Sequence, residues 1–297
     1  MKKRILQIVV FLAILFVLDR GVAAFFRTGL ERYYGIGREA DVLVIGHSHL
    51  MKTCNKKTLE RELDMKIAKY CCEGVLTQAR LAMVKHFLEK QKGRPVSYML
   101  YGVDPLLFHS GGLGLNSYKQ FYPYMDTSAM DAHVRRNASW WDYTLHKHLH
   151  CTRYIDVSMY RSARGWMGYW ESLSRGQISA EKWNKPRPWS PGMDEQNVKA
   201  FHEAVQLMLD NGAHVVLVYP SIIQSYRTSN PEAYEYMMNY FRTMADNHPR
   251  IDFLDYSPLY AHRQELFEDP VHLNRKGEKL LTQQLIQDLK VIMQKKK

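Results

Sequence analysis

The sequence predicts an α/β fold in which a central parallel sheet is covered by helices on both faces. Short apolar runs rich in β-branched residues alternate along the chain with amphipathic stretches, which is the pattern of such folds. The 297 residues are enough to bury a full core. A composition of 46% hydrophobic and 24% charged residues argues against wholesale disorder.

The individual elements follow from this alternation. Apolar residues three and four positions apart predict helices at residues 77–91 and 195–211, the second stopped by Asn211-Gly212. Asn274 is expected to cap a last helix that runs to about Met293. The runs predicted to form strands are residues 41–45, 66–71, 96–103, 214–219 and 251–254.

Residues 109–191 interrupt the alternation and read as an aromatic-rich insertion, dense in Trp, Tyr and Arg and closed by prolines. We expect it to lie over the C-terminal edge of the sheet, where open α/β folds bind ligands. A peripheral packing element with aromatic filler is the alternative. Residues suited to a carbohydrate or an anionic polymer are Arg135, Arg136, Trp140 and Trp141, unless the tryptophans form the core of the insert.

The N-terminal residues predict the cellular location of the protein. Basic residues 2–4 precede an apolar run from Ile5 to Leu18, which is short for a bilayer span and resembles a signal-peptide core. The following Val22-Ala23-Ala24 is a poor cleavage site, so we expect residues 1–26 to be an uncleaved signal anchor or transmembrane helix, with a linker at 27–40. The rest of the chain then lies outside the cytoplasm, in the periplasm or extracellular space. A cleaved signal peptide and a partly buried core helix are the alternatives.

Net charge and cysteine content indicate which classes of ligand and which disulfide bridges to expect. A formal net charge of +11 favours anionic partners such as lipid headgroups or acidic polymers, and no nucleic-acid motif is present. The four cysteines form no C-x-x-C pair, so a structural zinc site is not expected. No other feature of the sequence calls for a metal or an organic cofactor. In an oxidising compartment they allow one bridge, for example from Cys54 to Cys71 or Cys72. We expect the alternating His146, His148 and His150 to form a solvated basic surface rather than a metal site.

Two separate motifs predict nucleophilic chemistry. Gly46-His47-Ser48 places a serine at the end of the first predicted strand, where helix amides can face a developing oxyanion. A serine needs a base, and histidine serves best near neutral pH. Near the other end, Asp269 and His272 are three residues apart, which brings both side chains to one side of a turn or of the first coil of a helix. They can supply that base and the carboxylate that orients it, or they are merely a cap and a surface histidine.

Together, Gly46-His47-Ser48 and the segment 269–274 (Asp-Pro-Val-His-Leu-Asn) resemble the SGNH/GDSL hydrolase superfamily. The resemblance covers about residues 41–289. It implies a flavodoxin-like three-layer αβα sandwich over residues 41–297, with the insertion at 109–191. It also implies that Ser48 is the nucleophile, His272 the base and Asp269 its carboxylate partner, with the amides of Ser48 and Gly74 as the oxyanion hole.

Two positions depart from the family pattern. His47 stands where the first block has an aspartate, and Asp104 stands near the place of an oxyanion-donating asparagine. An ionised aspartate cannot donate a hydrogen bond, and losing one donor typically costs about a hundredfold in turnover. We expect the side chains of His47 and His49 to point away from Ser48, so that neither serves as its base. His47, Asp104 and Tyr219 are expected to line the substrate site.

The anchored layout and the altered blocks resemble the branch that includes the D-alanine transfer protein of teichoic acid synthesis and alginate O-acetylation proteins. This resemblance implies a Ser-His-Asp O-acyltransferase or esterase acting on a cell-envelope polysaccharide or glycolipid, with an integral-membrane O-acyltransferase as a partner. One alternative is a catalytically inactive accessory protein that binds polymer for such a partner. Another is a protein that binds anionic lipid or polymer through its positive surface alone.

Overall fold

The computed structural model describes residues 2–110, 116–155, 157–169, 192–228 and 230–295. The chain groups into two compact units. Unit 1 comprises residues 1–34 and 116–169, and unit 2 comprises residues 35–115 and 170–297. The predicted sheet lies entirely in unit 2, whereas residues 116–169 of the predicted insertion group with the N-terminal helix. Residues 111–115, 156 and 170–191 of that insertion lie outside the described residues.

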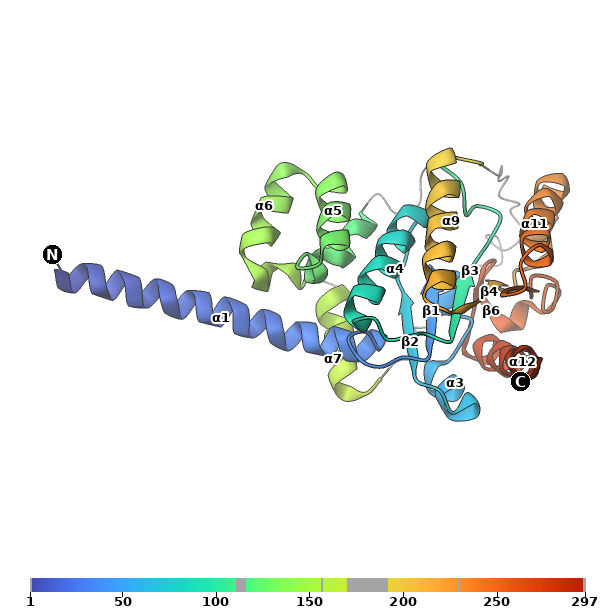
Figure 1. Ribbon diagram of the computed structural model, residues 1–297, viewed down its shortest axis with the longest axis horizontal. Helices are drawn as coiled ribbons and strands as arrows, with labels where there is room; N and C mark the ends of the chain where they lie inside the picture. Colours follow the sequence, from blue (N-terminus) through green and yellow to red (C-terminus); the bar gives the residue numbers. More distant parts are fainter. Residues whose placement is uncertain (1, 111–115, 156, 170–191, 229, 296–297) are drawn as a thin grey trace. The chain divides into compact units, whose positions relative to one another are not determined.

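Unit 2 is built on a five-stranded parallel sheet (Figure 1). Its strand order β2-β1-β3-β4-β5 is the flavodoxin-like order, which places the ligand crevice at the C-terminal ends of β1 and β3. Every predicted strand is confirmed to within two residues at each end. The strands are β1 (Val42–Gly46), β2 (Ile67–Cys71), β3 (Tyr98–Gly102), β4 (His214–Tyr219) and β5 (Ile251–Asp255).

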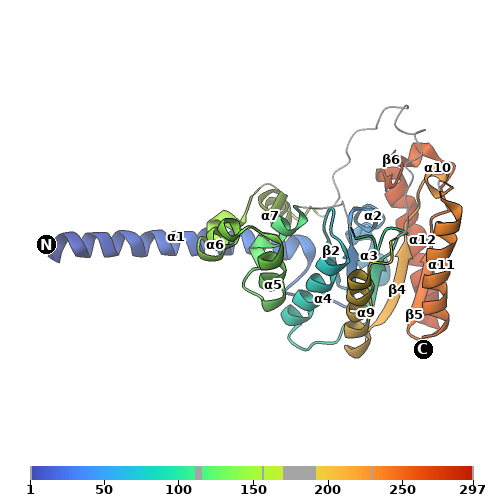
Figure 2. The same ribbon diagram turned by 90° about the horizontal axis from the view of Figure 1, so that it is seen from above.

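Helices cover both faces of this sheet, so the predicted αβα architecture is confirmed. On one face, Val42, Val44 and Leu100 share a hydrophobic core with α3 (Lys56–Leu63) and α12 (Arg275–Gln294). The opposite face carries α4 (Thr77–Gln91), α9 (Glu195–Asp210) and α11 (Pro231–Asp246); α4 and α9 lie side by side in Figures 1 and 2.

The second core is aromatic. The Phe201 ring on α9 lies 5.3 Å from that of Tyr101 on β3 and 6.2 Å from that of Phe241 on α11. The predicted ranges of α4 and α9 are confirmed, and Asn274 caps α12 by accepting the amides of Lys276 and Gly277. The short elements of unit 2 are α2 (Ser48–Met51), α10 (Gln224–Arg227), the 3₁₀ helix η3 (Gln264–Leu266), β6 (Phe267–Asp269) and β7 (His272–Leu273).

A fully buried histidine makes stability depend on pH. His86 on α4 is 0% exposed, with its Nδ1 3.1 Å from the hydroxyl of Tyr70. Burial, aided by the charge of Lys90, lowers its pKa from 6.5 to about 3. The unfolded chain therefore takes up the proton first, and the free energy of unfolding falls as pH drops from about 6.5 toward 3.

We expect this histidine to contribute a loss on the order of 2 kcal/mol between pH 6.5 and 5. Urea denaturation of wild type and His86→Gln across this range measures it. The variant should lose stability less steeply with acidification, whatever its stability at pH 7, and an unchanged slope would contradict the assignment.

Unit 1 contains the long helix α1 (Lys2–Tyr34), which continues past the predicted anchor end near residue 26 and makes most of the predicted linker helical. Its second half packs against α7 (Val157–Met167) so closely that a Cβ on Gly165 would lie 1.8 Å from the Gly29 carbonyl oxygen. This packing extends the helix. The other elements are the 3₁₀ helix η1 (Ser117–Tyr124), α5 (Ser128–Asn137), α6 (Trp140–His148) and the 3₁₀ helix η2 (His150–Arg153).

The first half of α1 is exposed throughout residues 2–18. Only 6% of its most apolar stretch is buried, so it is not a core helix, and it is long and apolar enough to cross a membrane. A membrane anchor and a signal sequence both have this character.

Other side chains of the insertion differ from expectation. His146 is buried and its ring stacks on Tyr122 at 3.9 Å, so the three alternating histidines do not form one solvated surface. Trp140 and Trp141 are exposed and are not the core of the insert. All four cysteines are free; Cys151 is exposed, and the other three are buried.

Candidate active site

Ser48 is the first residue of α2 and directly follows the end of β1. Two glycines make this abrupt change possible: Gly46 and Gly102 end the adjacent strands β1 and β3. A Cβ on either would lie 3.0 Å from Cβ of Leu50. Because neither glycine has a side chain, Leu50 can pack against the edge of the sheet, and α2 can begin directly after β1. Ser48 stays partly exposed at the C-terminal edge of the sheet.

Asp269 and His272 face each other across a tight antiparallel hairpin formed by β6 and β7, rather than lying in a helical turn. One carboxylate oxygen of Asp269, Oδ1, accepts the backbone amides of Val271 (3.0 Å) and His272 (2.9 Å). The turn is also tied to the sheet region, because the Ile223 amide donates to the Pro270 carbonyl at 3.0 Å. The hairpin therefore fixes both side chains.

These residues form a continuous relay with Ser48. His272 Nδ1 lies 2.7 Å from Asp269 Oδ2, and His272 Nε2 lies 2.7 Å from Ser48 Oγ. Burial opposes ionisation of Asp269, but its hydrogen bonds with His272 and the neighbouring amides outweigh it and lower its pKa to about 2. An ionised carboxylate must accept, so Nδ1 carries the proton and Nε2 is free to accept from the Ser48 hydroxyl.

Two backbone amides follow the C-terminal ends of the paired strands β1 and β2, where the sequence predicts an oxyanion hole. One is the Ser48 amide at the start of α2, and the other belongs to Gly74, which follows the neighbouring strand β2 with φ of 66°. Neither amide donates to another of the described residues. Their role as the oxyanion pair stays a prediction.

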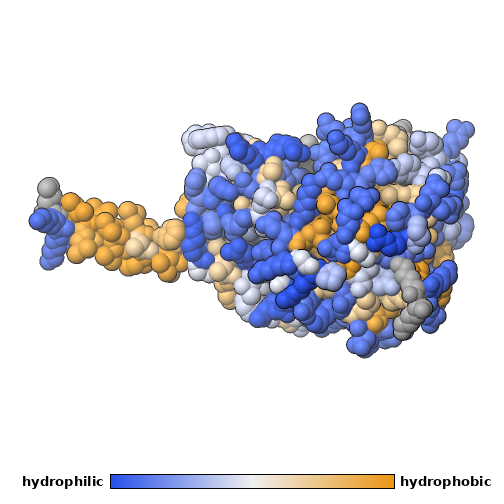
Figure 3. Space-filling view, viewed as in Figure 1, coloured by the Kyte–Doolittle hydropathy of each residue, from blue (hydrophilic) through white to orange (hydrophobic). Residues whose placement is uncertain are grey.

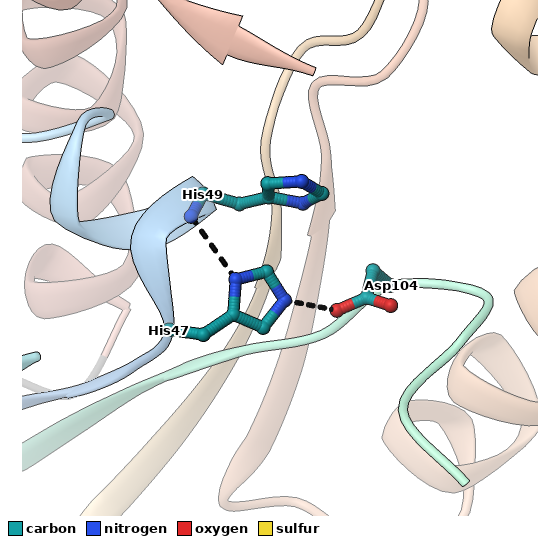
Figure 4. Close-up of side chains that lie close together, drawn as sticks. All are labelled: His47, His49 and Asp104. Carbon is teal, nitrogen blue, oxygen red and sulfur yellow. Dashed lines mark hydrogen bonds and ion pairs between the residues drawn. The ribbon is translucent and has the colours of Figure 1, made fainter. Parts of the chain in front are cut away.

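The two departures from the SGNH pattern are bonded to each other. His47 Nε2 lies 2.6 Å from Asp104 Oδ2, and His47 Nδ1 accepts the His49 backbone amide at 3.0 Å (Figure 4). Because Nδ1 accepts from an N–H, the ring proton must sit on Nε2 and is donated to Asp104. The remaining oxygen, Asp104 Oδ1, accepts the Leu106 amide at 2.8 Å. His47 and Asp104 were expected to contact substrate, but their polar atoms are engaged within the chain.

Asp104 is held in its ionised form. Burial opposes this, but His47, His49 and the buried guanidinium of Arg80 together lower the pKa of the Asp104 carboxyl. Arg80 itself donates to the Gly102 carbonyl at 2.7 Å, just before this loop. Burial lowers the pKa of His47 despite Asp104, consistent with a neutral ring that donates to a carboxylate.

Replacing Asp104 by asparagine should destabilise the protein although the side chains have the same shape. Both oxygens accept an N–H, so the new amide NH₂ must face either the His47 or the Leu106 donor. We expect the free energy of unfolding to fall by about 1–3 kcal/mol, measured by urea denaturation at pH 7. Asp246→Asn, at an exposed position on α11, is the matched control. Equal effects of the two variants would contradict the acceptor-only role of Asp104.

His49 is a site residue that sequence reasoning missed. Its ring lies 4.4 Å from the His47 ring and 5.1 Å from the His272 ring. It was expected to point away, but because α2 begins at Ser48, successive side chains turn by about 100° rather than alternate. Burial and the neighbouring imidazoles hold the pKa of His49 well below its usual value, so it packs as a neutral ring. The signal was the Gly-His-Ser-His quartet itself.

Among the residues that the structure describes, two groups of side chains bring potential metal-ligand atoms within 4.8 Å of one another: His47 with His49 and Asp104, and Glu268 with Asp269 and His272. In each group, some of these atoms already bond within the chain: His47 pairs with Asp104, and Glu268 forms a buried ion pair with Lys52. The absence of a metal requirement stays a prediction. Tyr219 is buried at the end of β4, with its ring 6.2 Å from that of Tyr234.

Comparison with known proteins gives distant structural likenesses and no match in sequence. No protein-family model matches the chain, and no curated protein matches its sequence. A solved structure of a protein assigned to the lipolytic G-D-S-L family, from Desulfitobacterium hafniense DCB-2, is similar with a TM-score of 0.39 and 9% identity. The match covers 83% of this chain and 98% of that one.

Proposed function

We propose that the chain is a serine-dependent acyl-ester enzyme, an O-acyltransferase or esterase. The observation that carries this proposal is the relay in which His272 lies 2.7 Å from both Ser48 Oγ and Asp269 Oδ2. A base within hydrogen-bond reach of a hydroxyl, oriented by a carboxylate, is the arrangement that activates a serine.

The proposed reaction has two halves. Ser48 Oγ attacks an ester carbonyl while His272 Nε2 takes the hydroxyl proton, and the Ser48 and Gly74 amides stabilise the oxyanion. His272 then returns the proton to the departing alcohol, leaving an acyl ester on Ser48. Water or a sugar hydroxyl next attacks this ester while His272 accepts its proton, and His272 returns that proton to Ser48 Oγ as the acyl–oxygen bond to Ser48 breaks. Water gives an esterase and a sugar hydroxyl gives a transferase.

We propose a cell-envelope polysaccharide or glycolipid as the acceptor, with the acyl group delivered from a membrane O-acyltransferase. An α1 that crosses the membrane behind basic residues would put the site outside the cytoplasm, periplasmic or extracellular. The net charge of +11 suits an acidic polymer. Resemblance to the membrane-anchored SGNH branch supports the same substrate class.

One observation favours a second function, a polymer-presenting accessory protein without turnover. The position expected to supply a third oxyanion donor holds Asp104, an ionised acceptor. Missing one donor costs about a hundredfold or more. An accessory protein would keep its biological role when Ser48 or His272 is replaced by alanine, whereas the enzyme would lose it.

A partitioning experiment tests the enzymatic proposal. Full-length protein in detergent is mixed rapidly with p-nitrophenyl acetate, alone or with teichoic acid fragments or uronate oligosaccharides. We expect a burst of one nitrophenolate per protein, followed by slower turnover that an accepted oligosaccharide accelerates as it becomes acetylated. Faster turnover with no acetylated sugar would assign an esterase. A folded protein without a burst would contradict acyl-ester chemistry at Ser48.

A further inference from the structure

Helix α6 of unit 1 exposes large apolar side chains on one surface. Trp140 and Trp141 are 65% and 76% exposed, and Leu145 and Leu149 are 45% and 48% exposed. Trp141 and Leu145 are one turn apart on α6, the Trp140 ring lies 4.5 Å from the Trp141 ring, and Leu149 caps the helix; these four side chains are here called the α6 apolar face. Exposed apolar groups of this size mark docking surfaces more often than chance packing.

The opposite side of α6 is fixed by polar contacts. Lys147 Nζ lies 2.7 Å from Asp131 Oδ1 on α5, and the Tyr143 hydroxyl donates to the same carboxylate at 3.1 Å. Arg153 donates from Nε to the His146 carbonyl at 2.6 Å. The outward direction of the α6 apolar face is therefore built into the packing of unit 1.

A carboxylate in α1 joins this region to the apolar N-terminal run. Asp19 accepts the backbone amides of His150 (3.0 Å) and Cys151 (2.7 Å), which follow α6 at the start of η2. Figures 1 and 2 show α6 running across the direction of α1, nearer its N-terminal end than α5 and α7 are. The α6 apolar face thus lies at the level where the exposed apolar run of α1 ends.

The length of that run places a bilayer surface at the same level. Residues 5–18 span about 21 Å as a helix, less than the roughly 30 Å of a hydrocarbon core. Apolar side chains cover the visible surface of this part of α1, with hydrophilic side chains at its tip (Figure 3), where the sequence has the basic residues 2–4. A bilayer centred on the run must therefore reach Asp19 and the adjoining α6.

We propose that the α6 apolar face lies in the headgroup region of the phospholipid bilayer that α1 crosses, with the two indole rings at the interface. Tryptophan prefers this depth, and amphipathic helices lying in the plane bind there. Exposed Arg135 and Arg136 end the preceding helix α5 and would attract anionic headgroups. The inference rests on α1 crossing the membrane and is independent of chemistry at Ser48. Attachment at two points would stop unit 1 from rotating about α1.

Quenching by brominated lipids tests this contact. Full-length protein is reconstituted into nanodiscs of phosphatidylcholine and phosphatidylglycerol, with or without bromine on the acyl chains near the headgroups. The chain has six tryptophans. We expect bromine to quench part of their emission, and Trp140→Phe/Trp141→Phe to lose most of the quenched part. Trp166→Phe is the matched control, because Trp166 on α7 donates to the Phe25 carbonyl, past Asp19 along α1, and its loss should leave that part intact.

Equal quenching in wild type and in the double variant would overturn the proposal, as would no quenching at all. If both tryptophans were shielded from solvent in native membranes but not in nanodiscs, the proposal would also be overturned. The α6 apolar face would then bind a membrane protein rather than lipid. Phenylalanine keeps the apolar character, and circular dichroism checks the fold. Ser48→Ala should quench like wild type, so failure of the catalytic proposal is recognised separately.

Discussion

Replacing Ser48 by alanine should abolish acyl-enzyme formation and lower kcat for ester cleavage by about four to six orders of magnitude. The Ser48 hydroxyl is the only group bonded to His272 Nε2 among the described residues, so no described side chain can take its place as nucleophile. What remains would be the weak effect of the two amides and of substrate binding. Stopped-flow and steady-state assays with an activated ester measure the loss.

Ser97→Ala is the matched control for this variant. Ser97 is exposed and precedes β3 at the N-terminal edge of the sheet, opposite the edge that carries Ser48. Its loss should leave both the burst and kcat unchanged. If Ser48→Ala kept a burst of normal size, another residue would be the acyl acceptor and the assignment of Ser48 would be wrong.

Replacing Asp269 by asparagine should lower kcat by about four orders of magnitude while the hairpin stays folded. Oδ1 accepts two backbone amides, so the amide oxygen must occupy that position and the NH₂ group must face His272. Donor would then oppose donor at Nδ1, and the ring would shift its proton to Nε2. A protonated Nε2 cannot accept the Ser48 proton.

The change in tautomer can be observed directly. Nitrogen-15 chemical shifts of the His272 ring should show the proton on Nδ1 in wild type and on Nε2 in Asp269→Asn. Asp246→Asn serves again as the control for activity. A kcat within tenfold of wild type in Asp269→Asn would mean that the carboxylate does not orient the base.

Local sequence patterns predicted the sheet and most of the relay because those features are local. A strand that ends in Gly46 fixes where Ser48 lies, and Asp269 and His272 are close enough in sequence to meet in any tight turn. The sequence did not distinguish a helical turn from the β6–β7 hairpin, since Pro270 fits both.

The features that sequence reasoning missed depend on contacts between distant segments. In the sequence, His47 and Asp104 each appear as a separate departure from the family pattern, because they lie 57 positions apart. In the structure they bond to each other at 2.6 Å. The pairing of α1 with α7 likewise depends on Gly29 and Gly165, and small residues carry no periodic signal. That packing explains why α1 continues past residue 26.

The most direct test of the central claim is labelling of full-length protein with a fluorophosphonate, followed by intact-mass and peptide mass spectrometry. Such a probe phosphonylates an activated serine oxygen with loss of fluoride. The relay predicts one adduct per chain, on Ser48, that disappears in His272→Ala and persists in Ser97→Ala. A folded protein that carries no adduct, or carries it on another residue, would contradict the assignment of Ser48 as an activated nucleophile.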